Sequence, residues 1–487
     1  MSPLLLFSFV IAYFLVLLSV AWYTSRNSNN DSFFIGNRNS NWMLVSFGMI
    51  GTSLSGVTFV SVPGTVGAGA FGYFQVVIGY FLGYFLVAFI LLPLYYRLNL
   101  TSIYNYLQQR FGFMAYKTGS LFFIISRVLG ATARLYLVIN VLQIFILNNM
   151  HVPFWLTTFV ILLMILLYTF EGGVKTIVFT DTLQTTFMLA GLVICMVYIM
   201  QSMHLSFSGT LHALQAKGYT HIFNTNINSA GFFVKQIVGG MFITVGMTGL
   251  DQEMMQKNIS VKNVKDSQKN MVTFSVVLLI VNLLFLTLGG LLYLFAQANN
   301  IAVKSDDLFP TVALNYLPSV VAIIFIIGLI SALFPSADGA LTALTSSFCI
   351  DILGIRRQEN LSEKQRKRIR LIVHFVFTVV FFICVLVFKR INDKTIINVI
   401  LKVAGYTYGP LLALFSFGIL TKRRLGEGAE VLVVCLASPV ACYFLDTYSA
   451  VIFGGYTIGT ELLLINGLLT FCGLWLVSQK AAAANGG

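Results

Sequence analysis

Runs of about 20 consecutive apolar residues recur along the whole chain, and they constrain its fold more than any other feature. A segment of this kind crosses a bilayer as a helix, because a helix satisfies its backbone hydrogen bonds internally. The chain is 57% hydrophobic and 10% charged, whereas about a quarter of the residues in a soluble domain are charged. Barrel strands are short and alternate polar with apolar residues, which this chain does not do. We therefore predict an all-α, multi-pass integral membrane protein with no sizeable soluble domain.

Thirteen membrane-spanning segments are predicted from these runs. They cover roughly residues 3–23, 41–66, 72–98, 114–148, 152–170, 177–203, 231–255, 271–297, 311–350, 369–389, 396–420, 428–447 and 461–479. The first run is long and lacks a basic start, so we interpret it as a span and not as a cleaved signal. The final AAAANGG is interpreted as a cloning-derived tail.

The distribution of basic residues predicts the orientation. An odd number of spans with the N-terminus outside places 21 of the 30 Lys and Arg residues in cytoplasmic segments and five outside. Positive residues prefer the cytoplasmic side, so we predict an inner-membrane protein with its N-terminus outside and its C-terminus in the cytoplasm. The net charge of +13 then needs no nucleic acid partner. The basic loop 356–370 is expected to lie beside anionic lipid headgroups.

Two spans are poor helices because of their glycine content. The second contains Gly48, Gly51 and Gly56, and the seventh contains Gly239, Gly240, Gly246 and Gly249. Such segments are tolerated where unwound backbone lines a cavity, and two of them five spans apart predict two inverted five-helix repeats. The predicted parts are an extra helix with a cytosolic loop (1–40), the first repeat (41–203), an extracellular loop (204–230), the second repeat (231–420), two extra helices (421–480) and the tail (481–487).

Motifs for enzyme chemistry are absent from the sequence. The five histidines form no HExxH cluster, no GxxxxGK[ST] pattern occurs, and none of the six cysteines forms a CxxC pair. We predict that the protein is not an enzyme. A channel or a sensor stays open as an alternative, although a sensor would normally carry an added soluble domain. The sequence makes no prediction of an oligomeric state.

Five charged residues inside predicted spans are singled out here, because charge within the membrane is costly and indicates function by default. Asp181 either caps a helix, pairs with a cytosolic lysine or acts in a site. Arg127 and Arg134 share one helix face, and each either pairs with a carboxylate, snorkels or contacts substrate. Lys402 lies near a helix end, which favours snorkelling or pairing. Asp338 is at least a dozen residues from either end of its span and is the strongest functional candidate.

The segment around Asp338 predicts a cation site. Pro335 removes a backbone donor and frees a carbonyl one turn earlier, near Ser331 and Ala332. Together with the Ser336 hydroxyl and the Asp338 carboxylate, this carbonyl provides hard oxygen ligands. Such ligands suit a small hard cation and not zinc or copper.

Five segments resemble the sodium/solute symporter family. They are GMIGTSLSGVTFVSVPG, GGVKTIVFTDTLQ, DQEMMQK, the ninth span ending FCIDIL, and GYTYGPLLALFSFGIL, in the family's order and over nearly the whole chain. The resemblance implies the LeuT-type fold of two inverted five-helix repeats. It also implies secondary active symport of a small organic solute, such as a sugar, sugar acid, amino acid or other organic anion. Transport would be driven by sodium through alternating access.

The resemblance places a sodium site between spans two and nine. Its ligands would be the backbone carbonyls of Gly51, Leu54 and Ala332, together with Pro335 and Ser336. Family members usually carry a hydroxyl where Pro335 stands, so this site departs from the pattern.

A second sodium site, known in some family members, would use Asp181, with Asp338 and Gly339 at the positions of two hydroxyls. Two readings follow for Asp338. It either supplies an anionic oxygen to sodium or, protonated in apolar surroundings, makes the protein a proton-coupled symporter together with Asp181. We prefer sodium, because most of the family's sequence pattern is intact.

The resemblance also implies a solute site at the breaks of spans two and seven. Arg127 or Arg134 would hold a carboxylate of the solute. Met247 lies near the position of the family's inner aromatic gate, where methionine is a departure that also fits ordinary packing. The remaining predicted solute-binding residues are Ser53, Ser55, Thr58, Gln75, Tyr80 and Gln252.

Overall fold

The computed structural model describes residues 3–25, 40–100, 102–169, 173–303, 305–391 and 395–479, and within them the chain is helical with isolated β-bridges and no strand. The longer helices are α1 (Pro3–Ser25), α3 (Trp42–Ser53), α4 (Gly56–Gly69), α5 (Phe74–Leu86), α8 (Phe113–Leu142), α9 (Phe154–Thr169), α10 (Gly173–Ser202), α11 (Phe207–Ala216), α12 (Phe233–Thr244), α14 (Val264–Ala298), α16 (Ser319–Ser347), α17 (Glu363–Ile391), α18 (Ile396–Thr407), α19 (Gly409–Leu420), α20 (Glu430–Thr447) and α22 (Leu462–Val477). The shorter ones are α6 (Leu92–Arg97), α7 (Asn105–Phe111), α13 (Gln252–Ile259), α15 (Leu308–Asn315) and α21 (Ser449–Ile452).

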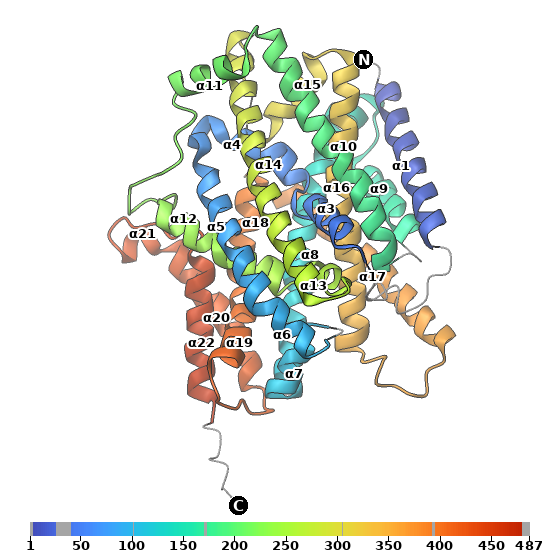
Figure 1. Ribbon diagram of the computed structural model, residues 1–487, viewed down its shortest axis with the longest axis vertical. Helices are drawn as coiled ribbons and strands as arrows, with labels where there is room; N and C mark the ends of the chain where they lie inside the picture. The colour runs from blue at the N-terminus through green and yellow to red at the C-terminus, as the bar shows by residue number, and fades with distance from the viewer. Residues whose placement is uncertain are drawn as a thin grey trace, which may run out of the picture.

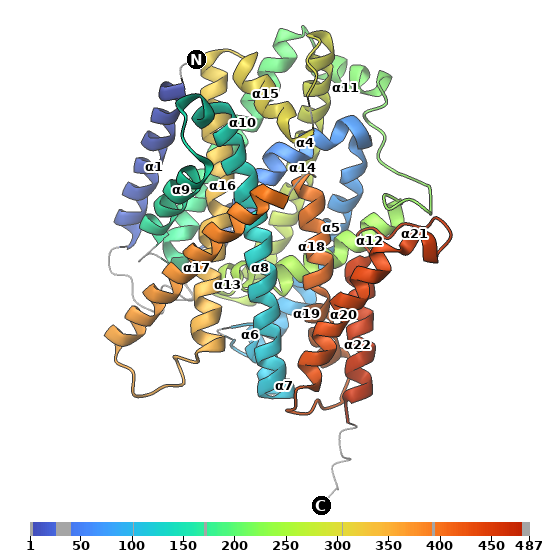
Figure 2. The same ribbon diagram turned by 180° about the vertical axis from the view of Figure 1, so that it is seen from behind.

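The helices form one elongated bundle (Figure 1). The start of α1 and helix α11 lie at one end of the long axis, whereas α7 and the end of α22 lie at the other end in both views (Figures 1 and 2). Among the described residues, eight helical segments are long and apolar enough to cross a membrane, and two bent helix pairs bring the number to ten. Helices α3, α9 and α22 are apolar but shorter. Each of the 13 predicted segments contains helix, while 13 crossings remain a prediction. The tail 481–487 and the loop 26–39 lie outside the described residues.

Both predicted helix breaks are present. Helix α3 ends at Leu54, whose ψ of 75° is not helical, and α4 begins after Ser55, which has an extended backbone. The second break turns the chain by 65° between the segment Phe233–Gly249 and α13. There a π-helical turn, Val245–Gly249, precedes Asp251, whose side chain accepts hydrogen bonds from the backbone N–H groups of Glu253 and Met254. A carboxylate at this position caps the new helix and satisfies donors that the break exposes.

Two features of the helices differ from prediction. The predicted span 311–350 is two helices, α15 and α16, because Pro318 stands directly before α16 and separates them. Pro335, in contrast, lies inside a continuous α16. A third bend, of 44° between α18 and α19, was not predicted and coincides with Tyr408 and the following Gly409 and Pro410.

The broken helices lie at the centre of the bundle. Helix α10 packs along α16 and α3, and α5 packs along α12 and α14. Helices α5 and α12 approach so closely that a Cβ atom added at Gly79 would strike the backbone carbonyl of Ile237, and one added at Gly240 would strike that of Val76. Small residues allow such approaches between membrane helices.

Replacing Gly79 by alanine is therefore expected to lower the free energy of unfolding by about 1–3 kcal/mol, because the added methyl group meets rigid backbone. Gly130→Ala is the matched control, since nothing lies within 4 Å of a Cβ atom at that position of α8. Thermal unfolding of the purified variants measures the difference. Equal melting temperatures for the two variants would contradict the close approach.

Candidate functional site

A cavity of about 100 Å³ lies where the breaks of the two central helices meet. Its wall combines hydroxyl groups, one amide, two guanidinium groups and apolar side chains. Seven of the nine predicted solute-binding residues line it: Ser53, Ser55, Thr58, Tyr80, Arg127, Arg134 and Met247. Sequence reasoning did not single out Tyr73, Tyr84, Thr248 and Asn282, which also line it. Hydroxyl groups beside two guanidinium groups favour a small polar anion as the occupant.

The two predicted arginines both face this cavity but have different partners. Arg127 is 3% exposed and forms ion pairs with Glu253 and, at 3.7 Å, with Asp251. For Arg134, seven residues further along the same face of α8, no ion pair or hydrogen bond is found within the described parts of the chain. A guanidinium group without a counter-ion in such a place is suited to bind a carboxylate with two parallel hydrogen bonds.

The other two predicted residues lie outside this cavity. Gln75 borders a second, wider opening, where its amide donates to the carbonyl of Gly72 and its oxygen accepts from Asn224 N–H. Gln252 is buried, and its side-chain oxygen accepts a hydrogen bond from Ile103 N–H. Both glutamines thus bridge distant backbone segments. Their contact with solute stays a prediction.

The wider opening, of about 1460 Å³, leads toward the loop that contains α11. It shares Tyr73, Ile397 and Leu401 with the inner cavity, so these three side chains separate the two spaces. Asp306 accepts a hydrogen bond from Ile396 N–H and so holds the start of α18, which carries two of the three. Burial raises the pKa of the Asp306 carboxyl group above its usual range. Because the wider opening adjoins the inner cavity, the inner cavity is reached from the α11 end of the bundle.

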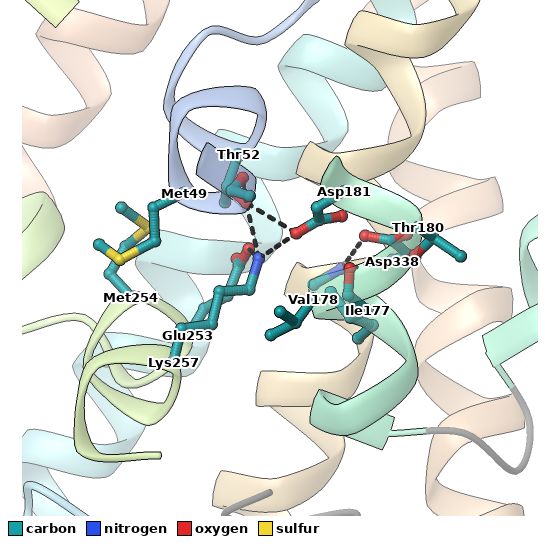
Figure 3. Close-up of polar contacts among 12 residues, drawn as sticks. Met49, Thr52, Ile177, Val178, Thr180, Asp181, Glu253, Met254, Lys257 and Asp338 are labelled. Atoms are coloured by element: carbon teal, nitrogen blue, oxygen red, sulfur yellow. Dashed lines mark hydrogen bonds and ion pairs between the residues drawn. The ribbon is translucent and has the colours of Figure 1, made fainter. Parts of the chain in front are cut away.

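A cluster of buried charges lies directly beside the cavity (Figure 3). Lys257, from α13, donates to the Asp181 carboxylate at 2.7 Å and to the Thr52 hydroxyl at 2.6 Å, and Thr52 lies 3.2 Å from the same Asp181 oxygen. Lys257 also lies 3.6 Å from Glu253, one helical turn away. We call Arg127, Asp181, Asp251, Glu253 and Lys257 the buried charge cluster. Buried charges are stable only when paired, and here they alternate in sign.

The predicted pairing of Asp181 with a cytosolic lysine takes an unexpected form. The partner is Lys257, which lies just beyond the predicted span 231–255 and so in a predicted cytoplasmic segment, but which is 2% exposed. Only one Asp181 oxygen is used. No hydrogen-bond partner reaches the other oxygen, Oδ1, from any part of the chain that the structure describes. A fully buried carboxylate oxygen without a donor is costly, and it is a ready ligand for a cation.

Asp338 faces α9 and α10 from the middle of α16. One carboxylate oxygen accepts from the Tyr168 hydroxyl and the other from Gly339 N–H, and the residue is fully buried. Asp338 is close enough to Asp181 and Lys257 for their charges to interact. Next to it, a Cβ atom at Gly339 would strike the carboxylate of Glu253. The glycine at position 339 therefore has a local reason, because a side chain there would meet the Glu253 carboxylate.

The predicted sodium site between α3 and α16 has suitable oxygen atoms. The break at Leu54 ends α3, so carbonyl groups of its last turn, including those of Gly51 and Leu54, lack helical donors. On α16, Pro335 provides no N–H for the carbonyl of Ser331, and Ala332 is fully buried. The Ser336 hydroxyl donates to the carbonyl of Leu333 at 2.9 Å. Helices α3 and α16 pack against each other, and the negative end of α3 favours a cation there.

Known proteins resemble this chain over nearly its whole length. The family model described as "Sodium:solute symporter family" matches residues 33–433. The sodium/sialic acid symporter SiaT of Proteus mirabilis is 21% identical over 477 residues, which cover 93% of this chain and 92% of that protein. The sodium/sialic acid symporter NanT of Aliivibrio fischeri is 22% identical over 482 residues, which cover 94% and 91%.

A solved structure, the substrate-bound outward-open state of a Na⁺-coupled sialic acid symporter, superimposes on this one with a TM-score of 0.82. The two sequences are 19% identical, and the match covers 98% of this chain and 99% of the other. This likeness confirms the predicted LeuT-type fold.

Proposed function

The chain belongs to the sodium:solute symporter family, and we propose that the solute it carries is a sugar acid of the sialic acid type. Members of this family are transporters and not enzymes, as predicted. Sodium is the coupling ion, and a small organic solute moves with it by secondary active transport. The identity of the solute, the residues that bind it and the orientation in the membrane are the parts that we propose.

The observation that carries this proposal is the pair of arginines in the cavity. Arg134 offers a guanidinium group that forms no ion pair with the residues that the structure describes, and Arg127 lies on the same helix face. The remaining polar wall consists of hydroxyl groups and Asn282, which suit the hydroxyl and amide groups of a sugar acid. A neutral polyol would offer the Arg134 guanidinium group no negative charge with which to pair. The two relatives named above are sodium/sialic acid symporters, which supports the same choice.

We assign sodium to two positions. The first lies between α3 and α16, with Gly51, Leu54, Ala332 and Ser336 as ligands and Pro335 freeing a carbonyl beside them. The second is Asp181, whose free oxygen is the support for this assignment. Asp338 then acts by bracing Tyr168 and α9 beside Asp181.

We also propose an orientation in which the α11 end of the bundle faces outward and the end of α22 faces the cytoplasm. The excess of basic residues in the predicted cytoplasmic segments supports it, and so does the basic loop 356–370, which would lie against anionic lipid. In this orientation the cavity opens to the outside.

Uptake of radiolabelled N-acetylneuraminate into proteoliposomes tests the solute assignment. We expect uptake to require an inward sodium gradient and to stop when potassium replaces sodium outside. Excess unlabelled N-acetylneuraminate should compete, whereas its methyl ester, glucose and myo-inositol should compete weakly because they lack the carboxylate that Arg134 would bind. Equal competition by the neutral compounds would contradict a sugar acid, and uptake with no dependence on any ion gradient would indicate a channel.

A further inference from the structure

We propose that Glu253 and Lys257 form a relay that couples the charge state of the solute cavity to sodium binding at Asp181. The relay runs from Arg127, at the cavity, through Glu253 and Lys257 to Asp181. It rests on the proposed sodium position at Asp181, and its solute arm rests on the proposed carboxylate solute.

The four residues form an unbroken chain of contacts. Arg127 pairs with Glu253, Glu253 lies 3.6 Å from Lys257, and Lys257 lies 2.7 Å from Asp181. All four are at most 3% exposed, so water screens their interactions little. Their charges alternate in sign from the cavity to Asp181. A change of ion-pair partner at one end therefore changes the electrostatic energy of the charges at the other end.

Each end of the chain is open to one ligand. Arg127 lines the solute cavity, where a carboxylate can compete with Glu253 for the guanidinium group. Asp181 carries an oxygen without a partner among the described residues, while Lys257 occupies its other oxygen. Lys257 is thus a tethered cation that competes with sodium for the same carboxylate. Whether Lys257 stays paired with Asp181 depends on how strongly Glu253 attracts it.

Glu253 is built to exchange partners. Its carboxylate lies against Gly339, where a larger residue would displace it, and it faces Arg127 on one side and Lys257 on the other. The neighbouring Asp251 is fixed instead, because it caps α13 and accepts a hydrogen bond from Tyr408 at 3.0 Å. When a solute anion draws Arg127 away, Glu253 turns fully to Lys257. Lys257 then releases Asp181, and sodium binds.

Charge balance makes the two ligands mutually dependent. A sodium ion at one end and a carboxylate at the other continue the alternation of positive and negative charges. Together they leave the net charge of the site unchanged. Either ligand alone leaves an uncompensated charge in a poorly screened environment. Each ligand must therefore strengthen the binding of the other by the same factor, as linkage requires.

Sodium titrations of thermal stability test the relay without any solute. Binding to the folded state raises the melting temperature by mass action, so a titration at constant ionic strength with choline chloride gives the half-saturating sodium concentration. Arg127→Gln imitates the loss of Arg127 to a solute and is expected to lower this concentration about fivefold or more. In Glu253→Gln, Asp181 is the remaining carboxylate partner of Lys257. This variant is expected to raise the half-saturating sodium concentration by a similar factor.

Two further variants separate a relay from a general electrostatic effect. Arg134→Gln also removes a cavity guanidinium group, but one without an ion pair to Glu253, so its sodium titration should stay within about twofold of the wild type. The double variant Arg127→Gln/Glu253→Gln should titrate like Glu253→Gln alone, because the effect of Arg127 passes through Glu253. Equal shifts for both arginine variants, or additive effects in the double variant, would overturn the relay.

If Glu253→Gln does not fold, Lys257→Met serves in its place. Sodium then binds Asp181 without a competing ammonium group, and adding Arg127→Gln should have no further effect. A shift of about fivefold on adding Arg127→Gln would overturn the relay. N-acetylneuraminate added to the wild type should lower the half-saturating sodium concentration. If it does not, while the variants behave as expected, the proposed solute fails and the relay stands.

Discussion

Replacing Asp181 by asparagine is expected to abolish sodium-driven uptake at low sodium concentrations. Asparagine keeps the size of the side chain but removes the negative charge that holds both Lys257 and the incoming ion. Losing a charged partner at a buried site costs about 1.5–3 kcal/mol, which weakens sodium binding about 10- to 100-fold. The measurements are the sodium dependence of N-acetylneuraminate uptake and the sodium titration of the melting temperature.

Asp181→Asn also leaves Lys257 as a buried charge with a weaker partner, which alone lowers stability. The double variant Asp181→Asn/Lys257→Met removes both charges and separates the two effects. We expect it to regain stability while sodium binding at Asp181 stays weakened, so that its sodium titration resembles that of Asp181→Asn. Glu461→Gln is the control for loss of an ion pair elsewhere, since Glu461 lies 3.8 Å from Lys235 and borders neither cavity. Normal sodium stimulation in the double variant would contradict the role of Asp181.

Replacing Arg134 by glutamine is expected to remove the preference for an acidic solute. The wild type should bind N-acetylneuraminate about 10- to 100-fold more tightly than its methyl ester, because a hydrogen-bonded charge pair contributes about 1.5–3 kcal/mol. In Arg134→Gln this ratio should fall to about threefold or less, chiefly by loss of affinity for the acid. Competition of both compounds against labelled uptake measures the ratio.

Lys402→Gln is the matched control for Arg134→Gln. Lys402 is a cation of the wider opening and already pairs with Asp446 at 2.6 Å, as the sequence analysis allowed. Its replacement should leave the ratio of acid to ester unchanged. An equal fall of the ratio in both variants would show that the general positive charge of the access route, and not Arg134, selects the acid.

The sequence by itself determined the helical membrane fold and the positions of the two breaks in the second and seventh predicted spans. Apolar runs of membrane length require helices, and the glycines of the second and seventh spans cannot sustain regular ones. The breaks at Leu54 and Leu250–Asp251 follow from these local properties. The sequence also predicted seven of the residues that line the cavity, because most of them belong to segments that surround the breaks.

Only the tertiary structure decided which charges are partners. Lys257 and Asp181 are 76 residues apart in the chain, and nothing in either local pattern shows that they meet. The spacing of Glu253 and Lys257 by four residues was a visible signal, but it indicates only a shared helix face. Pairing depends on the packing of α3, α10, α13 and α16, and so does the room that Gly339 leaves for Glu253.

The same reason explains the two glutamines that lie outside the cavity. Gln75 and Gln252 are on the right helices, but their side chains meet backbone groups of segments brought close by the fold. Burial and helix formation follow from the composition of each segment. The hydrogen-bond partner of a polar side chain depends on how the segments pack, because that partner lies on a segment distant in the sequence.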